Sequence, residues 1–80
     1  MPHIVVKLYP GCTEEQKENL ASLITRDVMS ALNKPEGSVS IAMEEVSPDD
    51  WAEKVFRPEI LEYRGKLYQK PGYNPFADKT

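Results

Sequence analysis

The sequence predicts an α/β (α+β) fold, with a single β-α-β unit of parallel strands followed by short C-terminal helices. Two runs rich in β-branched residues, 4–9 and 38–46, flank a long segment whose apolar residues recur at spacings of three and four. A strand, a helix and a strand in this order form a right-handed crossover, which makes the two strands parallel. The helix then covers one face of the sheet, so we expect assembly to bury the other.

The first strand is expected over residues 4–9, a β-branched and aromatic run that Pro10-Gly11 closes. Apolar side chains fall on both faces of this strand, with Ile4, Val6 and Leu8 on one and Val5, Lys7 and Tyr9 on the other. We therefore expect both faces to meet protein, one of them in another subunit.

The helix is expected to begin after Thr13, whose hydroxyl stands three residues ahead of the Gln16 amide in a capping box. It should run to about Asn33, before the breaking sequence Lys34-Pro35-Glu36-Gly37. One side of it carries an apolar stripe, made of Leu20, Leu23, Ile24, Val28, Ala31 and Leu32. We expect the polar remainder to form a solvated face, which includes Glu14, Lys17, Glu18 and Arg26.

The second strand is expected within residues 38–46, where Val39, Ile41 and Met43 alternate onto one face. A short helix should follow, because Ser47 supplies an N-cap hydroxyl and Pro48 suits the first helical position. The apolar side of this helix consists of Trp51, Val55 and Phe56.

We expect Pro58 to begin a further segment, which could be helical through Ile60, Leu61, Tyr63, Leu67 and Tyr68. The turn Lys70-Pro71-Gly72-Tyr73 and the following Phe76 could lay aromatic rings on a surface, including one across a dimer interface. The alternative is a frayed terminus.

The 80 residues favour one domain over 1–80, with a core at about 2–46 and a C-terminal helical extension and tail at about 47–80. A net charge of −3 without a basic run argues against nucleic acid, and one cysteine allows no internal disulfide. Cys12 and His3 are too few ligands for a metal, so we expect neither a metal nor another cofactor. Lacking a membrane-spanning stretch or a secretion signal, the chain is expected to act in the cytoplasm.

Pro2 follows the initiator Met1 directly. Removal of Met1 would leave a free secondary amine, whose nitrogen can take up a proton because its lone pair is not delocalised into an amide. The structural alternative is that proline, which lacks an N–H, suits the first residue of an edge strand.

These features resemble the tautomerase superfamily typified by 4-oxalocrotonate tautomerase. The resemblance covers most of the chain and is carried by Pro2 with the strand at 4–8, by Gly11 with Glu14-Glu15-Gln16-Lys17, and by residues 38–46. It is closer still to the dimeric bacterial PptA branch, through Pro2-His3-Ile4, Ser40-Ile41-Ala42, Pro48 with Trp51, and Lys70-Pro71-Gly72-Tyr73.

The resemblance implies a tautomerase/MIF-like oligomer, with the catalytic proline at Pro2 and the aromatic pocket residue at Trp51. Two arginines of the typical enzyme are absent, since Cys12 and Ser40 stand at their positions. Arginine binds carboxylates through paired hydrogen bonds, so their loss argues against a dicarboxylate substrate. The PptA branch is associated with enols such as phenylenolpyruvate, which agrees with a more apolar pocket.

We therefore expect an isomerase that interconverts the keto and enol forms of a small 2-oxo acid, with Pro2 as general base. Trp51 would form an apolar wall, and a cation from Arg57, Arg64 or Lys7 would hold a carboxylate or developing enolate. One alternative is a related dehalogenase or decarboxylase in which protonated Pro2 is an acid. Another is a non-catalytic ligand-binding or assembly module on the same fold.

Three of the singled-out residues have simpler interpretations. Trp51 could be a core aromatic residue, His3 an exposed strand-end residue rather than a proton shuttle, and Cys12 incidental, since no base stands near it in the sequence. A small core and an uncovered sheet face predict a homodimer, with a hexamer built as a trimer of dimers as the alternative.

Overall fold

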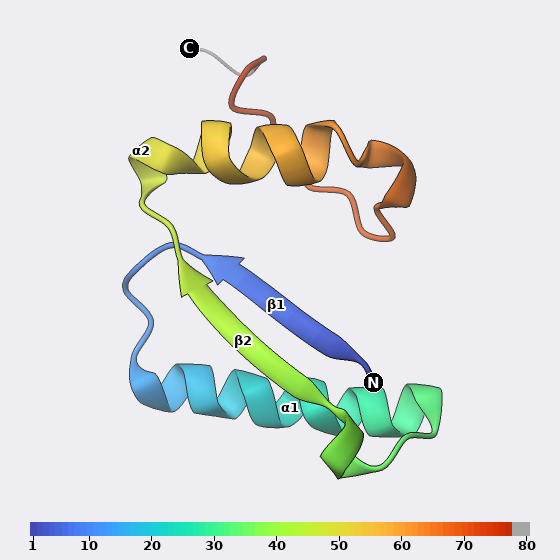
Figure 1. The fold of residues 1–80 in the computed structure, drawn as a ribbon. Coiled ribbons are helices and arrows are strands. Elements are labelled where there is room, and N and C mark those ends of the chain that lie inside the picture. Colours follow the sequence, from blue (N-terminus) through green and yellow to red (C-terminus); the bar gives the residue numbers. More distant parts are fainter. Residues whose placement is uncertain (78–80) are drawn as a thin grey trace. The chain divides into compact units, whose positions relative to one another are not determined.

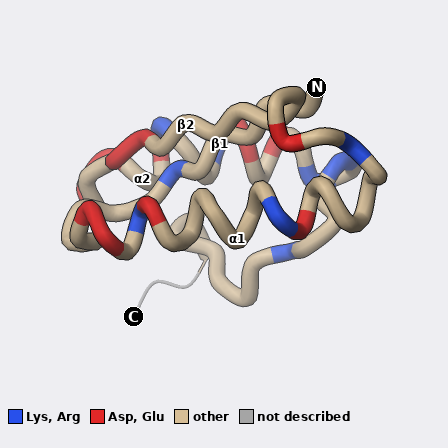
Figure 2. Tube along the Cα trace, turned by 90° about the horizontal axis from the view of Figure 1, so that it is seen from below, with Lys and Arg blue, Asp and Glu red and all other residues tan. Residues whose placement is uncertain are grey.

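The computed structural model describes residues 1–77 and divides into two compact units, Met1–Glu45 and a second that begins at Val46 (Figure 1). Within residues 1–77, no helix combines the length and the apolar content that crossing a membrane requires. Basic and acidic positions are interspersed along the chain without a long run of either sign (Figure 2).

The first unit is the predicted β-α-β unit, which confirms the fold class. Strand β1, His3–Leu8, pairs in parallel with β2, Ser40–Glu45, in a two-stranded sheet (Figure 1). The register runs from His3 opposite Ser40 to Leu8 opposite Glu45. β2 begins later than the sequence suggested because the 3₁₀ turn η1, Glu36–Ser38, comes before it.

Helix α1, Glu14–Leu32, connects the strands and has the predicted ends. The Thr13 hydroxyl accepts a hydrogen bond from the Gln16 N–H at 3.0 Å, and the Gln16 side chain accepts one from the Thr13 N–H at 2.8 Å. These bonds satisfy two amides that have no partner inside the helix. At the other end Asn33 is the C-cap in the left-handed region, with φ of 57°.

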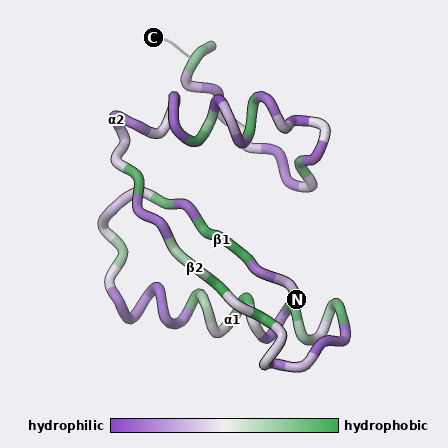
Figure 3. Tube along the Cα trace, viewed as in Figure 1, coloured by the Kyte–Doolittle hydropathy of each residue, from purple (hydrophilic) through white to green (hydrophobic). Residues whose placement is uncertain are grey.

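The apolar stripe of α1 is only partly covered. Ile24 and Val28 are half-buried, whereas Leu20 and Leu23 are each 38% exposed and Leu32 is 54% exposed. The strands carry hydrophobic stretches of their own (Figure 3), and Val5 of β1 is 45% exposed. Much apolar surface of this unit therefore stays accessible, as the expected assembly requires.

One residue of the expected solvated face, Lys17, is only partly exposed. The side chain of Lys17 is only 19% exposed, because its ammonium forms an ion pair with Glu45 at the end of β2, at 2.6 Å. A contact with the far end of the sheet cannot be inferred from helical periodicity alone.

The second unit begins with helix α2, Pro48–Trp51, and Ser47 caps it as predicted, its hydroxyl accepting from the Asp50 N–H at 3.3 Å. The helix then continues as the π-helix η2, Ala52–Leu61. The predicted break at Pro58 is therefore wrong. Proline lacks an N–H and in α geometry would collide with the carbonyl four residues earlier. Pro58 lies inside the wider π-helix, whose last turn ends with the Glu62 N–H donating to the Arg57 carbonyl.

The further helix expected after Pro58 is reduced to the 3₁₀ turn η3, Arg64–Lys66, and Leu67 and Tyr68 lie outside any helix. Beyond it the chain folds back on its own unit. The ring of Phe56 lies 5.3 Å from Tyr73 and 6.1 Å from Phe76, centroid to centroid. The predicted tail thus lays aromatic rings on a surface, and its last residues, 78–80, lie outside the described part.

Candidate active site

Pro2 immediately precedes β1 and is half-buried. Its carbonyl accepts a hydrogen bond from the Ser40 N–H at 3.2 Å, which fixes it beside the first residue of β2. In the structure its nitrogen belongs to the Met1–Pro2 peptide bond, and the Met1 ammonium donates to the Ser38 carbonyl. An amide nitrogen is not basic, so base chemistry at Pro2 requires a chain that starts there.

His3 and Ser40 form a pair directly next to Pro2. The His3 Nδ1 and the Ser40 Oγ lie 2.7 Å apart, joined across the register of the two strands. The sequence placed Ser40 where the typical enzyme has an arginine, and its hydroxyl is occupied by the histidine. Pro2, His3 and Ser40 are therefore brought together at one end of the sheet.

Lys7 stands further along the same strand, opposite Glu44. Its ammonium lies 3.7 Å from the Glu44 carboxylate, and its side chain is 26% exposed. Of the three candidate cations, Arg57, Arg64 and Lys7, only Lys7 is in the same unit as Pro2, and the Glu44 carboxylate partly neutralises its charge.

Trp51 closes α2 in the second unit and is half-buried. Its indole Nε1–H donates a hydrogen bond to the Tyr73 hydroxyl at 2.8 Å, and the Tyr73 ring packs on Phe56. The sequence did not identify Tyr73 as a partner of Trp51. The signal available was the turn Lys70-Pro71-Gly72-Tyr73, which returns the chain toward its own helix.

Arg57 also belongs to the second unit, on η2. Its guanidinium makes two hydrogen bonds to Glu53, at 2.9 and 3.1 Å, and lies 4.4 Å from the centroid of the Phe76 ring. The hydrogen bonds to Glu53 raise the pKa of Arg57 and hold the pKa of the Glu53 carboxyl below its usual value. The guanidinium is thus positioned by a carboxylate and an aromatic ring.

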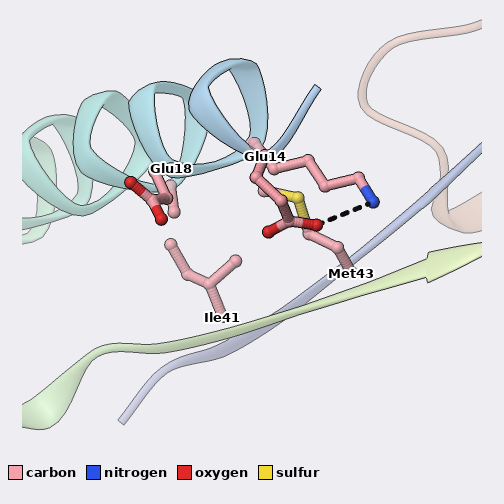
Figure 4. Close-up of a pocket in the computed structure, with 6 residues that line it drawn as sticks. Glu14, Glu18, Ile41 and Met43 are labelled. Carbon is pink, nitrogen blue, oxygen red and sulfur yellow. Dashed lines mark ion pairs between the residues drawn. The ribbon is translucent and has the colours of Figure 1, made fainter. Parts of the chain in front are cut away.

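A pocket of about 310 Å³ lies between α1 and β2 in the first unit. Figure 4 shows Glu14 and Glu18 on the helix side, with Ile41 and Met43 rising from the strand below. Lys17 lines the same pocket, and its hydrogen bond to Glu45, together with the nearby Glu14 at 3.6 Å, raises the pKa of its ammonium. Lys17 therefore stays protonated near neutral pH and is not a base.

Cys12 is a free, exposed thiol just before α1. Among residues 1–77, no group of three or more histidine, cysteine, aspartate or glutamate side chains is arranged to hold a metal ion.

The position of Pro2 at the head of a β-α-β unit agrees with the sequence model of a known family, described as "Tautomerase enzyme", which matches residues 2–57. The chain belongs to the tautomerase family. The match begins at Pro2 and includes both strands, α1 and the segment that holds Trp51 and Arg57.

Relatives within the tautomerase family resemble the chain over nearly its whole length. It is 41% identical over 75 residues to a protein named Tautomerase PptA from Klebsiella pneumoniae, covering 92% of this chain and 99% of the relative. It is 35% identical over 77 residues to a probable tautomerase from Xylella fastidiosa, covering 96% and 94%. The resemblance to the PptA branch inferred from the sequence is therefore confirmed.

Solved structures of tautomerase relatives share the fold. YwhB, a homologue of 4-oxalocrotonate tautomerase, superposes with a TM-score of 0.62 at 31% identity, covering 68% of this chain and 88% of YwhB. A chain solved in an analysis of trans-3-chloroacrylic acid dehalogenase activity gives a TM-score of 0.61 at 27% identity, covering 65% and 98%. The family's architecture thus accompanies more than one named reaction.

Proposed function

We propose that the protein is a tautomerase that interconverts the keto and enol forms of a small, apolar 2-oxo acid such as phenylpyruvate, with the Pro2 amine as general base. The observation that carries this proposal is Pro2 itself, at the head of β1 and at the first residue of the family match. A keto-enol shift needs one base that removes a proton and returns it to another atom of the same conjugated system. A single secondary amine meets that need.

The surroundings proposed for Pro2 follow from the same requirement. A secondary amine is mostly protonated at neutral pH unless desolvation or a nearby cation favours its neutral form. We assign the apolar wall to Trp51, whose indole is fixed by Tyr73, and the cation for the substrate carboxylate to Arg57 or Lys7. Because both cations already face carboxylates, we expect a single substrate carboxylate rather than a dicarboxylate.

The exposed apolar side chains of the first unit support a homodimer, with a trimer of dimers as the alternative arrangement. Among residues 1–77, only Val55 and Phe56 are buried, which is little core for a chain of this length. A single domain over residues 1–80 and a cytoplasmic location stay predictions. Sedimentation at low protein concentration tests the assembly, and a stable, folded monomer would contradict it.

The test of the function compares two forms of the chain. The form that starts at Pro2, verified by intact mass, should ketonise phenylenolpyruvate, and a form with one extra residue before Pro2 should lose most of that activity, because its proline nitrogen is an amide. Equal activity of the two forms would overturn the role of Pro2 as base. Inactivity of both would favour a non-catalytic ligand-binding module.

A second candidate function is dehalogenation, which the likeness to the chain from the dehalogenase analysis favours. There the amine would act as an acid and would have to be protonated. The dependence of the rate on pH separates the two, since a base gains activity as its amine loses a proton and an acid loses activity. The absence of arginine at Cys12 and Ser40 counts against the dehalogenase.

A further inference from the structure

The second unit contains another pocket, of about 300 Å³. It includes Arg64, which the sequence analysis considered for the reaction, but none of the residues to which the proposed reaction is assigned, Pro2, Trp51, Arg57 and Lys7. Its floor comes from η2, where Phe56, Ile60 and Leu61 line it together. Hydrogen bonding over five residues widens the helical turn, so residues four and five positions apart share one face. The unusual π-helix therefore creates this apolar floor, and such helices recur at functional sites.

The side chains of this pocket that are not already packed against another ring are mainly aliphatic. The rings of Phe56 and Tyr73 already pack against each other, tilted at 53° with centroids 5.3 Å apart. The aliphatic side chains that remain to meet a ligand are those of Ile60, Leu61 and Leu67. The volume lies at the lower end of the range for small-molecule sites, so the occupant must be small.

Two cations, Arg64 and Lys70, line the same pocket. The Arg64 Nε donates only a long hydrogen bond, 3.4 Å, to the Leu61 carbonyl. Among residues 1–77, no carboxylate lies within ion-pair distance of Arg64 or Lys70. Arg57, seven residues before the first residue of η3, is by contrast held by both oxygens of Glu53.

We propose that this pocket is a binding site for an aliphatic monocarboxylate, whose chain lies on Ile60, Leu61 and Leu67 and whose carboxylate faces Arg64 and Lys70. Apolar walls with a few convergent polar groups are the usual makeup of small-molecule sites. The site is a binding function beyond the proposed tautomerase reaction, and it does not depend on Pro2.

Tyr73 connects the pocket to Trp51, so that ligand binding can be detected by tryptophan fluorescence. It lines the pocket, and its hydroxyl accepts the hydrogen bond from the indole of Trp51. Trp51 is the single tryptophan of the chain. A ligand that shifts Tyr73 changes the surroundings of that indole, so binding can be followed by tryptophan fluorescence without any catalytic turnover.

The test is a fluorescence titration of the full chain with octanoate, confirmed by calorimetry. We expect saturable binding that weakens by up to about fourfold for each methylene removed in hexanoate and butanoate. The neutral analogue 1-octanol should bind about tenfold more weakly or worse, because it lacks the charge that Arg64 and Lys70 face. Absence of saturable binding would overturn the proposal, and so would equal affinity for the acid and the alcohol.

Matched variants locate the binding. The double variant Arg64→Gln with Lys70→Gln should lose about tenfold or more in octanoate affinity. Lys66→Gln should stay within about twofold, because the Lys66 ammonium lies 5.0 Å from the centroid of the Tyr63 ring and Lys66 does not line the pocket. Equal losses in both variants would refute the site. A chain with an extra residue before Pro2 should bind octanoate normally even though it is inactive, which separates this proposal from that of the tautomerase.

Discussion

Replacing Tyr73 by phenylalanine tests how the C-terminal segment holds Trp51. The substitution keeps the ring that packs on Phe56 and removes only the hydroxyl that accepts from the Trp51 Nε1–H at 2.8 Å. A hydrogen bond of this kind stabilises a folded protein by about 1 kcal/mol. Tyr73 is 45% exposed, so water can partly replace the lost acceptor and the cost should not exceed that figure by much.

The assay is urea unfolding followed by the fluorescence of Trp51, at a fixed protein concentration because assembly shifts apparent stability. For a small chain, a loss of about 1 kcal/mol lowers the urea midpoint by about 1 M or somewhat less. The native emission should also move to longer wavelength as the indole meets more water. Tyr68→Phe is the matched control, since the Tyr68 side chain is fully exposed. If both variants gave the same midpoint and the same spectrum, the role assigned to Tyr73 would be refuted.

Three further substitutions test the local interactions. Thr13→Ala breaks the capping box with Gln16 and should lower the free energy of unfolding by about 1 kcal/mol, measured by circular dichroism in urea; an unchanged midpoint would contradict the cap. Asn33→Ala should cost about 1–2 kcal/mol in the same assay, and Asn33→Gly should cost little, because only alanine resists the left-handed backbone there; equal costs would exclude this reason. Glu53→Gln should lower the melting temperature near pH 6, and the difference from the parent protein should shrink as the pH is lowered below 4. The pKa of Glu53 is lowered by Arg57, so its stabilisation is present above the unfolded value of about 4.3 and is lost as the pH falls through the folded one; a constant difference between the proteins across this range would contradict the pairing.

The elements of the first unit were predictable because their signals are local. The spacing of Thr13 and Gln16 marks the start of α1, and the alternation of Val39, Ile41 and Met43 marks the second strand. The parallel pairing follows from the crossover rule, which needs only the order of the elements.

The second unit was less predictable because its features depend on contacts far apart in the sequence. The usual effect of proline predicted that the helix would break at Pro58. No local sequence pattern predicts the π-helix in which Pro58 lies. The packing of Phe56 on Tyr73 and Phe76 joins residues 17 and 20 positions apart, a pairing that periodicity within one helix cannot reveal. The pocket lined by Arg64 and Lys70 includes Phe56 and Tyr73. It therefore could not be predicted from the sequence, because it depends on this long-range packing.

The candidate site was predictable in its chemistry and less so in its geometry. Pro2 could be identified because a terminal proline has a distinct nitrogen. The contacts of the candidate cations could not be predicted from the sequence. The contact of Lys7 with Glu44 follows from the strand register, and the contact of Arg57 with Phe76 follows from the fold of the tail.

The most direct measurement of the central claim is an NMR titration of the Pro2 nitrogen in the ¹⁵N-proline-labelled chain that starts at Pro2. We predict one protonation step that lies below that of an unstructured peptide with the same amino terminus and coincides with the rise of the catalytic rate. A nitrogen that does not titrate, or one that titrates as it does in the free peptide, would contradict the assignment of Pro2 as the general base.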